Sequence, residues 1–266
     1  METSSSKLNI LFIGDLIGSP GRDAFAKLLP SLRERYSPDV VIVNGENSAG
    51  GFGITAPIYE ELLSVGADVI TSGNHIWDKK EILKVIDTLP KLIRPANFPA
   101  NAPGRGSFVL ELEGGVKVGF LNLAGRVFME ALECPFKVAL AEVERLKKET
   151  NFIIVDMHAE ATSEKVALGH YLDGKVSAVI GTHTHVQTAD EKILAGGTAY
   201  ITDAGMTGPF DSVIGVDKEI IIKRFVTSMP ARFEVASGEN ELNGVFVKIG
   251  SDGKALEIER VSERVG

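Results

Sequence analysis

The chain has 266 residues, of which 44% are hydrophobic, and this length allows a substantial α/β domain with a continuous core. Its formal net charge is −8 and its basic residues form no block, which argues against a long nucleic acid as a partner. A small phosphate substrate is compatible with this charge, because bound metal ions can reverse the local potential.

Cysteine content and apolar runs indicate the compartment and the domain organisation. A single cysteine, Cys134, excludes an intramolecular disulfide and suits a reducing cytosol, so we expect a cytoplasmic protein. No apolar run is long enough to span a bilayer, and we expect no membrane partner. Residues 1–7 predict a flexible tail, since they offer little to bury. No linker divides residues 8–266, which we expect to form a single domain.

The first part of the chain alternates predicted strands and helices. Continuous apolar runs that end in turns predict strands covered on both faces, and apolar positions at helical spacing predict the helices. The expected strands are 8–14, 40–43 and 69–72, and the expected helices are 22–36, 58–63 and 79–88. This alternation is typical of right-handed βαβ crossovers in a layered α/β fold.

The second part mixes hairpins with further crossovers. Glycine-containing turns separate two pairs of apolar segments and predict two antiparallel hairpins. These hairpins are 108–121 and 244–261, the helix between them is 137–149, and the strands are 152–157 and 178–180. Mixed strand directions, in one sheet or in two facing sheets, fit this order better than a purely parallel sheet.

Polar side chains follow the ends of five predicted strands. In α/β sheets the carboxyl ends of the strands face one edge, where ligands bind. Carboxylate, amide and imidazole groups without any thiolate are typical ligands of transition metals. Four of the five histidines of the chain belong to this set. The candidate residues are Asp15, Glu46, Asn47, Asn74, His75, His158, His183 and His185.

Each candidate also has an ordinary structural explanation. Asp15 fits a turn or helix cap, Asn74 fits an N-cap, and His158 fits a buried histidine with satisfied hydrogen bonds. His183 and His185 would place both rings on one face of a strand, which favours a metal but also occurs by chance. Their joint placement favours a metal site, because independent structural histidines need not all follow strands.

A few other residues are open to two interpretations. Arg94 and Arg126 would either clamp a phosphate or form surface ion pairs. Trp77 would stack on a base or, as the favoured alternative, pack in the core. His170 lies in a helical context and is interpreted as a buried structural histidine.

The motifs GNHIWD and GTHTH resemble the calcineurin-like metallophosphoesterase superfamily. The blocks FIGDLIGSPGR, IVNGENSAGGFGIT, LAGRVFM and DAGMTGPFDSVIGVDKEIIIKRF are similar to one branch, the bacterial YmdB-like phosphodiesterases. The chain departs from the wider superfamily, which usually has a histidine at the position of Ile17 and commonly a bridging aspartate at the position of Glu46. The YmdB-like branch shares these changes.

The resemblance implies an α/β fold of the calcineurin-like metallophosphoesterase type. In this fold two mixed β-sheets pack together and are flanked by helices, which gives a four-layer α/β/β/α sandwich. Segments 122–137 and 205–236 would then be insertions at the rim of the active site. We also expect a homo-oligomer.

The resemblance further implies two transition-metal ions, expected to be iron, with manganese or zinc as alternatives. His75 would be the proton donor to the leaving oxygen. One metal would be held by Asp15, Glu46, Asn47 and His185, and the other by Asn74, His158, His183 and the bridging Glu46.

The expected activity is hydrolysis of cyclic nucleotides, above all 2′,3′-cyclic nucleoside monophosphates, by in-line attack of a metal-bound hydroxide. The glycines of NSAGGFG suit a close approach of backbone N–H groups to a phosphate. Two alternatives stay open: a phosphomonoesterase such as a nucleotidase, and a metal-stabilised regulatory protein in which residues 206–233 bind a partner.

Overall fold

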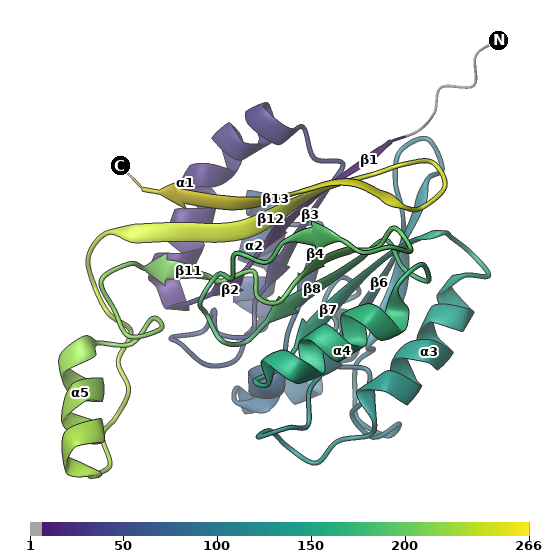
Figure 1. Ribbon diagram of the computed structural model, residues 1–266. Coiled ribbons are helices and arrows are strands. Elements are labelled where there is room, and N and C mark those ends of the chain that lie inside the picture. The colour runs from purple at the N-terminus through teal and green to yellow at the C-terminus, as the bar shows by residue number, and fades with distance from the viewer. Residues whose placement is uncertain (1–6, 266) are drawn as a thin grey trace.

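The computed structural model describes residues 7–265 and contains two β-sheets with helices on their outer faces (Figure 1). The tail expected at residues 1–7 lies outside the described residues, apart from Lys7. None of the helices within 7–265 combines the length and the apolar character that crossing a membrane requires.

The first sheet has seven strands in the order β2-β11-β12-β1-β3-β4, with β13 paired to β12. These strands are β1 (Leu8–Ile13), β2 (Asp15–Leu16), β3 (Val40–Asn44), β4 (Val69–Thr71), β11 (Met206–Pro209), β12 (Asn240–Ile249) and β13 (Ala255–Arg264). β1, β3 and β4 run parallel, whereas β12 runs antiparallel to both β1 and β13. The sheet is therefore mixed, and it contains the C-terminal hairpin that the sequence predicts.

The second sheet has six strands in the order β5-β6-β7-β8-β10-β9. These strands are β5 (Ser107–Glu111), β6 (Lys117–Ala124), β7 (Phe152–His158), β8 (Ala178–Thr182), β9 (Lys192–Ile193) and β10 (Ala199–Ile201). β6, β7, β8 and β10 are parallel, and β5 joins β6 as the predicted antiparallel hairpin.

Alternation of side chains along the strands builds the layers, because successive residues point to opposite faces. In β1, Ile10 and Phe12 belong to the core between the sheets, which also contains Phe120 of the second sheet. Leu11 and Ile13 face the other way and pack with the helices. A third core covers the outer face of the second sheet. The expected four-layer α/β/β/α arrangement is thus confirmed.

The helices divide between the two outer faces. α1 (Gly18–Tyr36) and α2 (Ala56–Val65) cover the first sheet, and α3 (Pro135–Leu146) and α4 (Thr162–Leu172) cover the second. α5 (Lys218–Thr227) lies at one end of the molecule, away from these layers (Figure 1).

The helix expected at 79–88 is wrong in type. The segment forms the short 3-10 turns η2 (Lys80–Lys84) and η3 (Ile86–Thr88), which follow a further 3-10 turn, η1 (Asn74–Trp77). Their hydrogen bonds join residues three apart, such as the Ile82 N–H to the Lys79 carbonyl at 2.9 Å. Pro90 disfavours helical geometry at the residue before it, and the tighter turns let Ile82 and Ile86 reach the core beside α2.

Candidate metal centre

The eight candidate residues come together where the parallel strands of both sheets end. Asp15 opens β2 directly after β1, Glu46 and Asn47 follow β3, and η1 begins at Asn74 after β4. The second sheet contributes His158 as the last residue of β7, and His183 and His185 in the loop after β8. Neighbouring strand ends in two facing sheets therefore bring residues that are far apart in the sequence to one rim.

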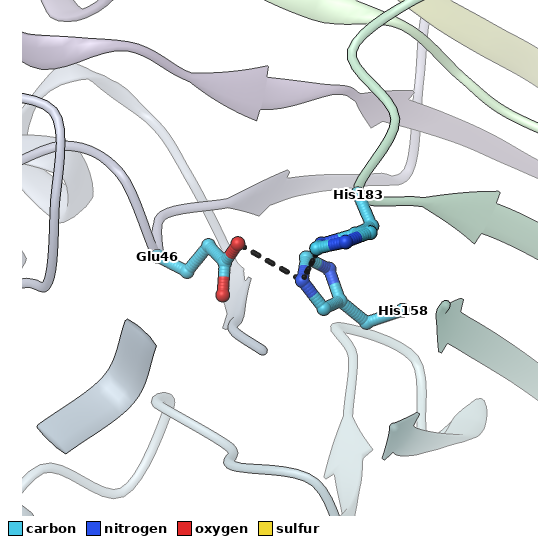
Figure 2. Close-up of side chains that lie close together, drawn as sticks. All are labelled: Glu46, His158 and His183. Carbon is cyan, nitrogen blue, oxygen red and sulfur yellow. Dashed lines mark hydrogen bonds and ion pairs between the residues drawn. The ribbon is translucent and has the colours of Figure 1, made fainter. Parts of the chain in front are cut away.

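One group of contacts centres on the Nε2 atom of His158. This atom lies 2.9 Å from Glu46 Oε1, 3.0 Å from Asn74 Oδ1 and 3.0 Å from His183 Nδ1. Figure 2 shows Glu46, His158 and His183 pointing toward one another, and their donor atoms all lie within 4.8 Å. The one N–H that His158 Nε2 can carry cannot donate well to all three of these atoms. A divalent metal between the four atoms could be bound by all of them.

A second group of contacts centres on His185 and shares Glu46 with the first. His185 Nε2 lies 3.2 Å from Asn47 Nδ2 and 3.8 Å from Asp15 Oδ1, and Asn47 Nδ2 lies 3.3 Å from Glu46 Oε1. Asp15 is fully buried, and its Oδ1 atom has no hydrogen-bond partner among the described residues. An unpartnered buried carboxylate oxygen is costly, so a cation beside it fits this donor set.

Outer hydrogen bonds orient the three histidines. His158 Nδ1 lies 2.9 Å from the Thr182 hydroxyl, which donates to Asp156 at 2.7 Å and so accepts from the ring. The Nδ1 atom of His185 donates to the Ile214 carbonyl at 2.9 Å, because a carbonyl can only accept. These bonds place a proton on each Nδ1 and leave each Nε2 as the nitrogen for a metal.

His183 is oriented in the opposite sense by Glu160. Its Nε2 atom lies 3.2 Å from Glu160 Oε2, so Nδ1 is the nitrogen that faces His158. The structure therefore supplies the outer partner that metal-binding histidines usually have, in a different chemical form for each of the three rings.

Charge interactions within the site displace the pKa values of its members. Burial opposes ionisation of Glu46 and protonation of His158, but their mutual attraction outweighs it. The pKa of Glu46 falls to about 2 and that of His158 rises to about 9. Burial, together with the charge of His158, lowers the pKa of His183 to about 3, so this ring is neutral at physiological pH. Burial also raises the pKa of Asp15.

Backbone geometry at the site limits substitution. His183 and His185 have φ values of +97° and +66°, in the region that side chains other than glycine rarely adopt. They lie in a loop beyond β8 and not on a strand, so the expectation of an H-x-H pair along a strand is wrong. The buried Asp203 carboxylate holds this loop by accepting the Thr184 N–H at 3.0 Å and the Lys165 ammonium at 2.7 Å.

Gly73 is required because the site is crowded. A Cβ atom added there would lie 2.2 Å from His158 Nε2 and 2.3 Å from Glu46 Oε2. The chain can therefore pass between β4 and Asn74 only without a side chain at this position.

His75 lies beside these two groups and is half-buried. The backbone N–H of His75 donates to Glu46 Oε2 at 3.1 Å, and the ring Nδ1 atom lies 2.9 Å from Asp78 Oδ2. Since a carboxylate can only accept, Nδ1 carries the proton and Nε2 is the ring nitrogen available to a ligand. Phe52 contacts the His75 ring edge-on, with centroids 5.0 Å apart.

A cavity of about 400 Å³ opens onto the candidate metal ligands. Glu46, Asn47, His75, His183 and His185 line one part of it. Another part is apolar and comes from the Gly-rich loop after β3 and from residues 213–235, which include α5. The size and the mixed lining are typical of a small-molecule site.

Arg94, Arg126 and Trp77, which had two interpretations each, and His170 lie outside the two groups of candidate ligands. Arg94 is buried and donates to the carbonyls of residues 95, 102 and 103, which is a structural role. The Arg126 side chain is exposed, and it does not line the cavity. Trp77 packs against the core and meets Phe98 edge-on at 5.7 Å, as the favoured alternative predicts. His170 is exposed on α4, so its interpretation as a buried histidine is wrong.

Sequence reasoning missed the residues that support the site. Glu160, Asp78, Thr182 and Asp156 contact the candidate ligands or their outer partners; Asp78 and Thr182 lie within the motifs GNHIWD and GTHTH, but none of the four was predicted to have a role. The available signal was proximity in sequence, since Glu160 follows His158 by two residues and Asp78 follows His75 by three.

Comparison with known proteins places this site in a family. The model of the YmdB-like protein family matches residues 11–261. A 2′,3′-cyclic-nucleotide 2′-phosphodiesterase of Bacillus subtilis is 53% identical over 96% of this chain and 96% of its own length.

Solved structures agree with this match. A crystal structure of a hypothetical protein from Thermus thermophilus is 40% identical, covers 97% of this chain and 100% of its own, and superposes with a TM-score of 0.91. A novel phosphatase from Mycoplasma pneumoniae is 38% identical, covers 98% of this chain and 94% of its own, and gives a TM-score of 0.92. Family match, identity and fold agree: the chain belongs to the YmdB-like protein family.

Proposed function

We propose that this phosphodiesterase hydrolyses 2′,3′-cyclic nucleoside monophosphates at the 2′ ester bond, leaving the nucleoside 3′-phosphate. The observation that carries the proposal is the pair of donor groups that share Glu46 and lie beside His75 at the floor of one cavity. The Bacillus subtilis relative, whose name specifies the 2′ bond of a cyclic nucleotide, supports this choice of substrate.

The two groups of contacts define the proposed ligand sets. We assign Asp15, Glu46, Asn47 and His185 to one metal and Glu46, Asn74, His158 and His183 to the other, with Glu46 shared. The Asn47 amide presents Nδ2 to Glu46 and His185, so a half-turn of the amide is needed to present Oδ1 to a cation. Iron is the proposed metal, and manganese and zinc suit the same donors.

Bound metal ions supply positive charge for the phosphoryl oxygens and lower the pKa of an attacking water. The protein's own groups prepare the site for them. Thr182, Ile214 and Glu160 fix which nitrogen of each histidine is free of a proton, and burial keeps bulk water away from Asp15 and Glu46.

We assign His75 as the general acid of the reaction. Attack by water forms a new P–O bond and releases one proton of that water to solvent, as the P–O2′ bond breaks and its electron pair stays on O2′. A protonated His75 donates its Nε2 proton to O2′, while Asp78 holds Nδ1 at 2.9 Å and stabilises the imidazolium. General acid catalysis of this kind contributes roughly 10²–10⁴-fold.

A comparison of two variants tests the proposal. His75→Ala is expected to lose roughly 10²-fold or more in kcat on 2′,3′-cyclic AMP with unchanged metal content, because His75 is not in either ligand set. Asp15→Ala is expected to lose both metal and turnover. Full turnover by His75→Ala would refute the assignment of the acid, and a preference for nucleoside 3′-phosphate over the cyclic diester would favour a phosphomonoesterase.

The alternative of a regulatory protein makes a different prediction for Asp15→Ala. We propose that residues 205–236 act as a cover over the active site, within a single domain that spans residues 8–266. If these residues instead bound a partner, an Asp15→Ala protein that stays folded would lose turnover and keep the cellular phenotype.

A further inference from the structure

The cavity above the candidate metal ligands has an aromatic wall that the proposed chemistry does not use. Phe52 lies in the Gly-rich loop after β3, and Phe233 lies beyond α5; both are half-buried and line the cavity. Their ring centroids are 6.3 Å apart, with planes inclined by 27°. Aromatic side chains that line a cavity beside a few convergent polar groups are typical of a small-molecule binding surface.

Other contacts hold the wall in place. The Arg224 guanidinium of α5 lies over the Phe233 ring, 4.6 Å from its centroid. Phe52 in turn meets the His75 ring edge-on, with centroids 5.0 Å apart. The aromatic surface therefore starts at the proposed acid and continues through Phe52 to Phe233.

The covalent bonds of the substrate limit how far its base can lie from His75. In a 2′,3′-cyclic nucleotide, O2′ is bonded to C2′, which is bonded to C1′, and C1′ carries the base. A substrate that places O2′ at His75 must therefore place its base within a few bonds of that ring, where Phe52 lies.

We propose that Phe52 and Phe233 form the nucleobase-binding wall of this cavity, so that the enzyme selects cyclic phosphates that carry a base. This inference rests on the proposed function, since it takes His75 as the donor to O2′. Recognition by ring faces tolerates every base, because each has a π surface, and predicts little preference between adenine and uracil.

The test compares 2′,3′-cyclic AMP with methyl riboside 2′,3′-cyclic phosphate, which has the same reacting atoms and no base. Phe233→Ala is expected to lower kcat/KM about 10-fold on the nucleotide and less than 2-fold on the baseless compound. Phe233→Trp keeps a stacking surface and is expected to retain most of the activity. Phe128→Ala is the matched control, because Phe128 is 89% exposed and does not line the cavity.

Equal losses by Phe233→Ala on the two substrates, or no loss on either, would overturn the inference while the proposed function stands. If the wild-type protein hydrolyses neither substrate, the proposed function fails, and binding decides the inference separately. In that case, calorimetric titration of the metal-loaded protein with 3′-AMP is expected to show about 10-fold weaker binding for Phe233→Ala. Equal binding by the two proteins would overturn the inference.

Discussion

Removal of the metal should make the stability of this protein depend on pH in a direction set by His158. His158 is fully buried, and its Nε2 lies 2.9 Å from Glu46 Oε1. Burial alone would lower the pKa of His158, but Glu46 raises it from 6.5 to about 9. Because the folded state holds this proton more tightly than the unfolded chain does, the stabilisation is complete below pH 6.5 and is lost as pH rises through 9.

The size of the effect follows from that interval. At about 1.4 kcal/mol per pH unit, the metal-free protein should lose roughly 3 kcal/mol of unfolding free energy between pH 6.5 and 9.5. The lowered pKa of Glu46 reports the same ion pair from its other side, so it is not added. A bound metal takes the place of the Nε2 proton, and the metal-loaded protein should therefore show no such loss.

Denaturant unfolding at several pH values, with and without metal, measures both curves. His158→Gln is the control, because it removes this titrating group and should lose less stability across the interval; the remaining slope, near pH 7, comes from Asp156, whose pKa burial raises to about 7. Metal-free wild-type protein that keeps or gains stability from about pH 6.5 to 9.5 would refute the assignment of a charged His158–Glu46 pair.

Three further substitutions probe the supporting residues. Asp78→Asn should lower kcat about 10-fold without loss of metal, since the amide cannot stabilise the imidazolium of His75; an unchanged kcat in steady-state assays would argue against this pair. Gly73→Ala should abolish metal binding in elemental analysis, because its Cβ would lie 2.2 Å from His158 Nε2, and normal metal content would contradict this crowding. Glu160→Gln should weaken metal affinity about 10-fold in competition titrations with a chelator, and unchanged affinity would exclude its role as an outer partner.

The layers of this fold can be predicted from the sequence because local patterns determine them. The alternation in β1 places Ile10 between the sheets and Leu11 under the helices, and the apolar runs before Glu46 and His158 mark strands that end at the site. The segment at 79–88 was predicted in the wrong form because its apolar residues have helical spacing, whereas it folds as the 3-10 turns η2 and η3, and Pro90 disfavours a continuation of helix through Leu89.

Local sequence patterns likewise predict one part of the candidate site and miss another. Its inner residues follow strands, so their position in the sequence indicates that they gather at one rim. The residues that orient them do not follow this rule: the Ile214 carbonyl lies 29 residues from His185, and Thr182 and Asp156 are ordinary strand residues. Such partners depend on how the two sheets and the 205–236 segment pack, which no local pattern contains.

The most direct test of the central claim is the rate of 2′,3′-cyclic AMP hydrolysis as metal is added back to stripped protein. We expect no turnover without metal, and a rate that rises with metal loading and levels off near two equivalents per chain. Turnover that is independent of metal, or no turnover at any loading, would contradict the account of a shared two-metal site around Glu46.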